Sequence, residues 1–353
     1  MRLLFLLSLL LTACGAVTEN HTLLIGTYTA NGSRGIYRTT FDPAKGTLGA
    51  AELVVEVDNP SYLALSEGND YLYAVSEGGK EENSALNAYR YDAQTGEFTL
   101  INRQPTGGAS PCYVGLFDGK AYTANYTGGS LSTFAIGDDG SLGEAEVQES
   151  EAREGSVSHI HGVFVAPDEK SLYVTDLGRS EIFQITSAGE EISRTQLNMG
   201  SGPRHMAFSQ SKAYALNELK GTVCVFDITP EGLQLKQEIA SDSVGGGGCA
   251  DIHLSADSRF LYASNRLKAD GVSVFSIDEQ GLLQKVGYTL TGIHPRNFTL
   301  SPDGEYMLVA ARDSNSVEVY RRDAETGLLT ATGEALEVSM PVCLVWLEYR
   351  RLM

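Results

Sequence analysis

Short segments rich in β-branched, aromatic and other apolar residues recur along the chain, and each ends in a polar or charged residue. They occupy residues 24–28, 72–77, 121–125, 172–176, 213–218, 261–266 and 307–312. Segments of this length and composition, separated by turn residues such as Gly, Asp and Asn, are typical of β-strands. No stretch shows a sustained helical period, so the pattern predicts an all-β protein.

The spacing of these segments predicts a repeated structural unit. Their central residues are 48, 49, 51, 41, 48 and 46 positions apart when taken as Ile25, Tyr73, Tyr122, Tyr173, Tyr214, Tyr262 and Leu308. Seven copies at this period are typical of the four-stranded blades of a β-propeller. The unit at 294–329 is the most complete, with expected strands at 298–300, 306–311 and 317–320 and turns at 301–304 and 323–327. We therefore predict a seven-bladed β-propeller.

A second type of strand indicates how the ring closes. It precedes six of the seven segments, at 59–65, 110–116, 159–165, 203–208, 249–254 and 295–300. No such strand precedes the segment at 24–28, but one stands at the C-terminal end, at 340–346. We expect this last strand to become the innermost strand of the N-terminal blade, so that the ring closes without a covalent link and leaves only short, protected edges. The propeller would then span residues 22–349.

The N-terminal residues predict export. Arg2 is followed by an apolar run at 3–11, and the sequence Leu-Thr-Ala then leads into Cys14. This run is too short for a membrane-spanning helix, which needs about 20 residues, and is typical of a signal peptide. The residues before Cys14 resemble a bacterial lipobox, which implies a signal peptide at 1–13, a lipid on Cys14 and a linker at 14–21. The protein would then be held in the bacterial cell envelope, with the lipid as its sole membrane contact. The alternative is an ordinary secretory signal with an unrelated cysteine.

Composition and charge narrow the possible partners. The chain of 353 residues has 45 acidic and 26 basic side chains and a net charge of −19. Such a surface repels phosphate backbones, so we expect no nucleic-acid partner. The four cysteines after Cys14 are scattered, with neither a C-x-x-C pair nor metal-type spacing, and resemble small buried hydrophobic residues, although export would permit disulfides. We expect no metal and no cofactor, and the sequence does not indicate an oligomeric state.

The predicted architecture gathers certain side chains at one mouth of the central channel. The first strand of a blade lines the channel and the second runs antiparallel to it, so the start of the first and the end of the second share one face. Strand starts supply Asn59, Ser110, His159, His161, Arg204, His205, Asp251, His294 and Arg296. Strand ends supply Tyr28, Glu77, Asn125, Tyr126, Asp176, Glu218, Arg266 and Arg312. Several histidines and arginines thus converge in an acidic protein, which predicts a small anionic ligand.

Several stretches at this mouth carry a family resemblance. They are His159-Ile160-His161, Gly202-Pro203-Arg204-His205, Leu216-Asn217-Glu218-Leu219, Ile252-His253-Leu254-Ser255 and Ser264-Asn265-Arg266. Together they resemble the seven-bladed lactonase family that includes bacterial 6-phosphogluconolactonase and the fungal carboxymuconate-lactonizing enzyme. The resemblance extends over nearly the whole chain after residue 13. It implies a lactone hydrolase and places its proposed catalytic residues on His161, Arg204, Glu218 and Arg266. We expect substrate contacts from the other polar residues of this mouth, namely His159, Glu77, Asn125, Asp251 and Arg296.

These residue types suit the opening of a lactone ring. His161 can act as general base toward water, although His159 alternates onto the same side of the strand and is an open alternative. Glu218 could instead take the proton or orient the histidine. The two arginines could bind an anionic substituent or stabilise the developing oxyanion. In a purely structural role, Arg204–Glu218 and Arg266–Asp251 would be buried ion pairs that set the blade register.

The substrate and the class of activity stay open at this point. Phosphorylated sugar lactones are cytosolic, whereas this chain has an export signal, so the substrate could be another aldonolactone or a carboxylated lactone. A non-catalytic envelope propeller that binds a polymer or protein is a second possibility, and a cycloisomerase that forms a lactone is a third. We expect His205 to point into a blade core, and we expect the glycine run at 245–248 to be a flexible rim loop rather than a phosphate-binding loop.

Overall fold

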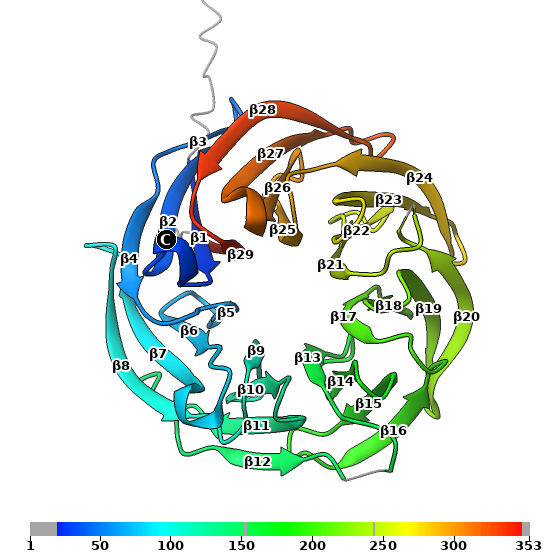
Figure 1. Cartoon of the computed structure of the whole chain (residues 1–353), viewed down its shortest axis with the longest axis horizontal. Coiled ribbons are helices and arrows are strands. Elements are labelled where there is room, and N and C mark those ends of the chain that lie inside the picture. Colours follow the sequence, from blue (N-terminus) through cyan, green and yellow to red (C-terminus); the bar gives the residue numbers. More distant parts are fainter. Residues whose placement is uncertain (1–19, 152–153, 243, 348–353) are drawn as a thin grey trace, which may run out of the picture.

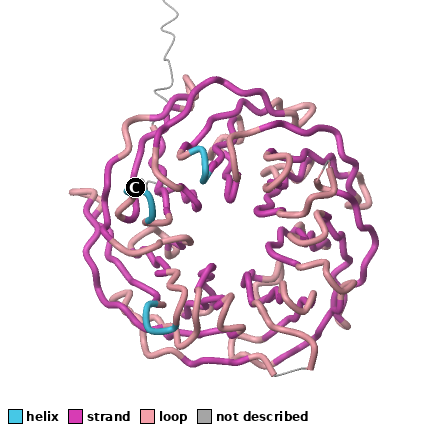
Figure 2. Tube along the Cα trace, viewed as in Figure 1, coloured by secondary structure: helices cyan, strands magenta, loops and turns pink. Residues whose placement is uncertain are grey.

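Seven β-sheets surround a central axis in the computed structural model, which describes residues 20–151, 154–242 and 244–347 (Figure 1). The predicted signal peptide and Cys14 lie outside the described residues. Figure 2 shows that strand is the dominant structure, with three short 3-10 turns at Ala30–Gly32 (η1), Glu81–Asn83 (η2) and Arg312–Ser314 (η3). The all-β, seven-bladed prediction is therefore confirmed.

The strands of each blade follow one another outward from the axis. The first blade contains β29 (Pro341–Leu347), β1 (His21–Thr27), β2 (Gly35–Asp42), β3 (Thr47–Leu48) and β4 (Glu52–Glu56). The second contains β5 (Leu63–Leu65), β6 (Tyr71–Ser76), β7 (Ala85–Asp92) and β8 (Glu97–Pro105). The third contains β9 (Pro111–Phe117), β10 (Lys120–Asn125), β11 (Ser130–Ala135) and β12 (Glu146–Glu149). The fourth contains β13 (Ile160–Val165), β14 (Leu172–Asp176), β15 (Glu181–Ile185) and β16 (Glu191–Gln196).

The remaining three blades have the same order. The fifth contains β17 (Pro203–Phe208), β18 (Lys212–Asn217), β19 (Thr222–Thr229) and β20 (Gly232–Ala240). The sixth contains β21 (Cys249–Leu254), β22 (Phe260–Asn265), β23 (Gly271–Ile277) and β24 (Leu283–Leu290). The seventh contains β25 (Pro295–Leu300), β26 (Tyr306–Ala311), β27 (Ser316–Arg322) and β28 (Leu329–Glu337). The expected innermost strand at 59–65 is shorter than predicted, because regular pairing with β6 begins only at Leu63.

The C-terminal strand closes the ring as predicted. β29 pairs antiparallel with β1, with Thr22 opposite Leu347 and Gly26 opposite Cys343. Leu344 packs in one apolar cluster with residues of β1 and β26, so the same strand joins the first blade to the seventh. The Trp346 indole N–H also donates to the Leu300 carbonyl at 2.7 Å. The closure therefore combines a strand ladder with a shared hydrophobic core.

Neighbouring blades are also joined by tyrosine hydroxyl groups from their second strands. Four of these hydroxyls donate to a main-chain carbonyl of the next blade, at 2.9–3.1 Å. The pairs are Tyr73–Gly140, Tyr122–Ser187, Tyr214–Gly281 and Tyr262–Gly327. Tyr173 occupies the same position in the fourth blade, but its buried hydroxyl has no hydrogen-bond partner among the described residues, and its ring stacks on Phe208. The junction between the fourth and fifth blades therefore lacks this bond.

We predict that removing residues 340–353 abolishes cooperative folding, because it exposes the edge of β1 and opens the core shared with the seventh blade. Circular dichroism during thermal unfolding would measure this. The matched control is removal of residues 348–353, which leaves β29 complete and should retain the wild-type transition. A chain without β29 that unfolds cooperatively within a few degrees of wild type would contradict the closure.

We predict opposite results for two tyrosine-to-phenylalanine changes. Tyr73→Phe should lower the free energy of unfolding by about 1 kcal/mol, since it removes a buried hydrogen bond and leaves a carbonyl unpaired. Tyr173→Phe should leave it unchanged or raise it slightly, because the hydroxyl that it removes is buried without a partner. Urea unfolding monitored by fluorescence would measure both. Equal destabilisation of the two variants would show that the interblade bond contributes nothing.

Candidate active site

One backbone hydrogen bond recurs in all seven blades and defines the channel mouth. The residue after the second strand donates its N–H to a main-chain carbonyl just before the innermost strand, at 2.7–3.1 Å. The acceptor directly precedes that strand in six blades, and in the second blade it is Asn59, four residues before β5 begins. The donor–acceptor pairs are Tyr28–Met340, Glu77–Asn59, Tyr126–Ser110, Leu177–His159, Glu218–Gly202, Arg266–Gly248 and Arg312–His294. The seven donor residues therefore occupy equivalent places around one end of the channel. The side chains at these equivalent backbone positions differ from blade to blade. The backbone at the mouth is therefore nearly symmetric, whereas the set of side chains there is not.

Bulges at the start of the innermost strands place a second set of side chains beside this mouth. The pairing register shifts between Ile160 and Gly162 in β13, between Pro203 and His205 in β17, and between Pro295 and Asn297 in β25. The bulged residues are His161, Arg204 and Arg296. A bulge removes a residue from the regular ladder and redirects its side chain. Three of the predicted site residues are thus aimed by the same local irregularity.

Arg204, Glu218 and Arg266 form one charged cluster. The Glu218 Oε2 atom lies 2.9 Å from Arg204 Nε and 3.2 Å from Arg266 Nη2. The arginine side chains are only 3% and 5% exposed, whereas that of Glu218 is 23% exposed. Although burial acts to raise it, the charges of Arg266, Arg204 and Arg296 hold the pKa of the Glu218 carboxyl below its usual value. Burial lowers the pKa of Arg266 to about 9. Glu218 is therefore an anion between two cations at neutral pH.

Asp251 is not the partner of Arg266, so the Arg266–Asp251 pair of the purely structural alternative does not form. The Asp251 carboxylate lies 2.8 Å from His205 Nδ1 and 2.9 Å from His253 Nε2, and it accepts a hydrogen bond from the Asn297 amide at 2.5 Å. Despite burial, which acts to raise it, the two histidines hold the pKa of Asp251 well below its usual value. Asp251 thus links the fifth, sixth and seventh blades. The guanidinium of Arg266 reaches Glu218 instead because it extends across the blade boundary.

His205 lies in the channel rather than in a blade core, so that expectation is wrong. Its ring packs edge-on against Tyr62, Tyr113, His161 and Phe164, with centroids 5.4–6.0 Å apart. The bulge at Arg204 explains the difference, because one extra residue reverses the side-chain alternation that follows it. Tyr62, Tyr113 and Phe164 also line an apolar cavity of about 460 Å³ in the channel. An aromatic layer thus lies between this cavity and the charged cluster.

The two candidate histidines have different environments. His161 is 4% exposed, and its Nδ1 atom has no hydrogen-bond partner in the part of the chain that the structure describes. Burial, followed by the charge of Arg204, holds the pKa of His161 well below its usual value, so the ring is neutral. His159 is only partly buried and stacks on Tyr126, and its Nδ1 donates to the Tyr126 carbonyl at 2.9 Å. The side chain with an uncommitted, buried nitrogen is therefore His161.

Glu77 and Arg296 meet on the side of the mouth formed by the first and second blades. The Tyr28 hydroxyl donates to Glu77 Oε2 at 3.0 Å, and the Arg296 guanidinium lies 5.4 Å from the centroid of the Tyr28 ring. Among the described residues, the Arg296 side chain makes no ion pair or hydrogen bond. Arg296 is therefore a cation at the mouth with no anion committed to it.

Asn125 does not join these groups in the structure. Its amide donates to the Ser130 and Ser132 hydroxyls at 3.0 and 2.7 Å, within its own blade. The reason is its position one residue before Tyr126, which occupies the mouth position of the third blade. Asn125 and Asp251 thus support the mouth from within, whereas His159, Glu77 and Arg296 border it.

The glycine run expected to be a flexible loop is tied down at several points. The Asp242 carboxylate accepts hydrogen bonds from the Val244 N–H at 2.7 Å, from the Gly246 N–H, and from the Gly247 N–H at 3.1 Å. Gly248 donates its N–H to the Glu218 carbonyl and accepts from Arg266 Nε at 2.8 Å. Gly247 has φ +68°, and a Cβ there would lie 2.6 Å from the Leu219 carbonyl oxygen. This loop therefore supports the charged cluster. The glycine run alone does not predict this role, because the contacts come from Asp242, Glu218 and Arg266.

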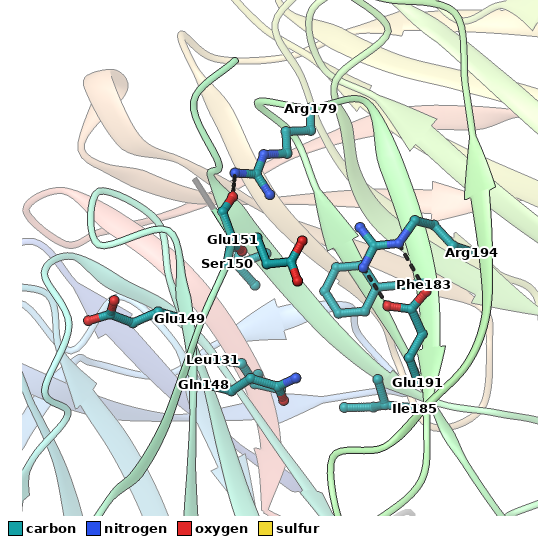
Figure 3. Close-up of a pocket in the computed structure, with 11 residues that line it drawn as sticks. Leu131, Gln148, Glu149, Ser150, Glu151, Arg179, Phe183, Ile185, Glu191 and Arg194 are labelled. Atoms are coloured by element: carbon teal, nitrogen blue, oxygen red, sulfur yellow. Dashed lines mark hydrogen bonds and ion pairs between the residues drawn. The ribbon is translucent and has the colours of Figure 1, made fainter. Parts of the chain in front are cut away.

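A separate pocket of about 330 Å³ lies between the third and fourth blades (Figure 3). Both arginines of this pocket already have partners: Arg194 pairs with Glu181 and Glu191, and Arg179 donates to the main-chain carbonyl of Glu151. None of the predicted site residues lines it. The candidate site is therefore the channel mouth.

The four cysteines in the described ranges, Cys112, Cys224, Cys249 and Cys343, are buried and form no disulfide. No three His, Cys, Asp or Glu side chains in these ranges gather as a metal site would require. No helix within them is long and apolar enough to cross a membrane.

Comparisons with known proteins identify the family to which this fold belongs. Residues 22–346 match the family described as a seven-bladed β-propeller lactonase. The 6-phosphogluconolactonase of Bacillus subtilis is 30% identical over 347 residues, which cover 92% of this chain and 97% of that protein. A candidate 6-phosphogluconolactonase of Bacteroides fragilis has 40% identity and a TM-score of 0.89, covering 95% of this chain and 99% of its own. The periplasmic gluconolactonase of Pseudomonas aeruginosa has 30% identity and a TM-score of 0.87, covering 94% and 99%.

Proposed function

The chain belongs to the lactonase family of seven-bladed β-propellers, and we propose that its channel mouth opens the ring of a small, anionic sugar-acid or carboxylated lactone. It is a lactone hydrolase of the 6-phosphogluconolactonase type. The observation that carries the proposal is the buried, uncommitted Nδ1 of His161 beside the Arg204–Glu218–Arg266 cluster. A neutral base and several cations at one mouth suit the attack of water on an ester carbonyl.

His161 is the general base in this proposal. Its neutral imidazole takes a proton from water while the water oxygen bonds to the lactone carbonyl carbon. The tetrahedral intermediate then collapses, the bond from the carbonyl carbon to the ring oxygen breaks, and the imidazolium returns its proton to that oxygen. A positioned base of this kind typically contributes about 10²–10⁴-fold to the rate. Glu218 suits the role of base less well, because its carboxylate is already paired with Arg204 and Arg266, whereas His161 Nδ1 has no partner among the described residues.

The three arginines of the mouth interact with different anionic groups of the substrate in this proposal. Arg204 and Arg266 stand where an oxyanion could form beside His161, and preorganised cations stabilise such charge strongly in a buried site. Arg296, with no committed anion, takes the carboxylate or phosphate of the substrate. Glu77 accepts hydrogen bonds from sugar hydroxyls, and His159 borders the substrate at the rim. Asn125 and Asp251 contribute indirectly, through the blade contacts that they make.

The fold also suggests how the enzyme faces its membrane. Tyr28, at the end of β1, lies at the mouth, whereas Thr22, near the start of that strand, pairs with Leu347 at the far end of β29. The chain therefore enters the propeller on the face opposite the active site. We propose that a lipid on Cys14 tethers this far face to the bacterial envelope, so that the mouth opens away from the bilayer.

Lipidation predicts that radiolabelled palmitate enters the wild-type protein in growing bacteria and that Cys14→Ser prevents this. Gel fluorography of the immunoprecipitated protein would measure incorporation. An unlabelled wild-type protein recovered in the soluble periplasmic fraction would instead indicate an ordinary secretory signal.

The catalytic proposal predicts that His161→Gln lowers kcat by about 10²–10⁴-fold, the contribution of a general base. The assay follows hydrolysis of gluconolactone and its 6-phosphate ester, with spontaneous hydrolysis subtracted. His159→Gln, two residues earlier in the chain, is the matched control and should affect kcat far less. Arg296→Gln should raise KM for the phosphorylated lactone more than for the neutral one. Wild-type rates no faster than buffer on a broad lactone panel would favour a propeller that only binds a polymer or protein partner.

A further inference from the structure

Each arginine of the charged cluster is hydrogen-bonded to a buried histidine. Arg204 Nη1 lies 3.1 Å from His205 Nε2, and Arg266 Nη1 lies 3.2 Å from His294 Nε2. A guanidinium can only donate, so both Nε2 atoms must be the acceptors in these hydrogen bonds. Each histidine is therefore unprotonated at Nε2 and carries its proton on Nδ1.

An aspartate faces the other nitrogen in both cases. His205 Nδ1 lies 2.8 Å from Asp251 Oδ1, and His294 Nδ1 lies 3.5 Å from Asp313 Oδ2. A carboxylate beside Nδ1 favours the tautomer that keeps the proton there. Two units of the same composition, Asp251–His205–Arg204 and Asp313–His294–Arg266, thus converge on Glu218. We call them the two Asp–His–Arg units.

The two units arise from different parts of the fold. His205 follows Arg204 directly in β17, with Asp251 supplied by the next blade. His294 and Asp313 belong to the seventh blade, whereas Arg266 belongs to the sixth, and His294 has φ +63°. Because the backbone arrangements are unrelated, blade symmetry does not explain why both arginines have the same support. We attribute the shared support to the need to orient both arginines toward Glu218, with which each forms an ion pair.

Several N–H groups of the Arg204 and Arg266 guanidiniums already have hydrogen-bond acceptors. Arg266 donates through Nε to the Gly248 carbonyl and through Nη2 to the Cys249 carbonyl, and Arg204 Nη1 also donates to the Ala250 carbonyl. Among the described residues, Arg204 Nε, Arg204 Nη2 and one N–H of Arg266 Nη1 have no hydrogen-bond acceptor, although Arg204 Nε lies 2.9 Å from Glu218 Oε2. The guanidiniums are thus fixed in orientation, with donors left over for a ligand.

We propose that His205 and His294 are positioning residues that, as neutral Nδ1–H tautomers, orient Arg204 and Arg266 for the developing oxyanion. The proposal rests on the lactonase function given above. Protonation of either ring would place a donor against a donor and add a charge beside an arginine.

The surroundings keep both rings neutral. Burial and the charge of Arg204 lower the pKa of His205 to about 4, although Asp251 opposes this. Burial, then Arg266 and Arg312, lowers the pKa of His294 to about 3, with Asp313 opposing. The imidazoles of His205 and His294 therefore remain acceptors for the arginines at neutral pH.

Nitrogen NMR of the ¹⁵N-histidine-labelled protein at pH 7 tests the tautomers without relying on activity. The expected result is that His205 and His294 are both neutral with the proton on Nδ1. Assignment uses His205→Gln and His294→Gln, each of which removes one set of signals. An Nε2–H tautomer or an imidazolium at either position would overturn the proposal, whatever the enzyme hydrolyses.

Kinetics of paired substitutions test the positioning role. His294→Leu removes the acceptor for Arg266 and should lower kcat by about 10–100-fold, the size expected for a small misplacement of a catalytic group. His294→Gln keeps an acceptor oxygen near the Nε2 position and should retain most of kcat. Equal losses in both variants, or no loss in either, would contradict the proposal.

The control separates positioning from general damage to the fold. Tyr73→Phe removes a hydrogen bond between the second and third blades and changes no residue of the two Asp–His–Arg units, so it should leave kcat and KM near wild type. Thermal unfolding of every variant shows whether a loss of kcat follows a loss of stability. If wild type hydrolyses no lactone, the proposed function fails, and the tautomers seen by NMR still decide whether the two Asp–His–Arg units exist.

Discussion

The antiparallel pairing of β29 with β1 is the contact on which the rest of the structure depends. Each blade buries its apolar faces only against its two neighbours, so an open ring would leave the first and seventh blades each with one uncovered face. The pairing covers both and removes a free strand edge. It also sets Met340 beside Tyr28, which completes the sevenfold set of hydrogen bonds at the mouth. Closure of the ring and construction of the site therefore use the same strand.

The mouth concentrates positive charge in a protein with a net charge of −19. Burying arginines is costly unless each has partners that replace water. Here the partners are one shared carboxylate, main-chain carbonyls of the loop that follows Asp242, and two neutral histidines. A single Glu218 pairs with both Arg204 and Arg266, and the Arg296 side chain makes no ion pair among the described residues, so the group formed by these four side chains carries more positive than negative charge. An anionic substrate would complete the neutralisation.

The backbone that forms the mouth and the side chains that would react there are determined by different positions in this fold. A symmetric backbone bond places one residue per blade at the mouth, and the side chains there differ: Tyr28 and Glu77 on one side, Glu218 and Arg266 on another. Bulges in three innermost strands then direct His161, Arg204 and Arg296 toward the same end. Related propeller lactonases could therefore change substrate through these positions without altering strand pairing. Strand pairing thus fixes the propeller frame, whereas the chemistry of the mouth depends on individual side chains.

The sequence by itself determined the number of blades, the closure by the C-terminal strand and most of the residues at the mouth, because the repeat period and the strand alternation can be read directly from the chain. The tertiary structure decided which of these residues touch. Arg266 reaches Glu218 rather than Asp251, and His205 enters the channel, because a bulge reverses the alternation and long side chains cross from one blade to the next. Such contacts depend on the angle and separation of neighbouring sheets. Those quantities exist only once the ring has closed.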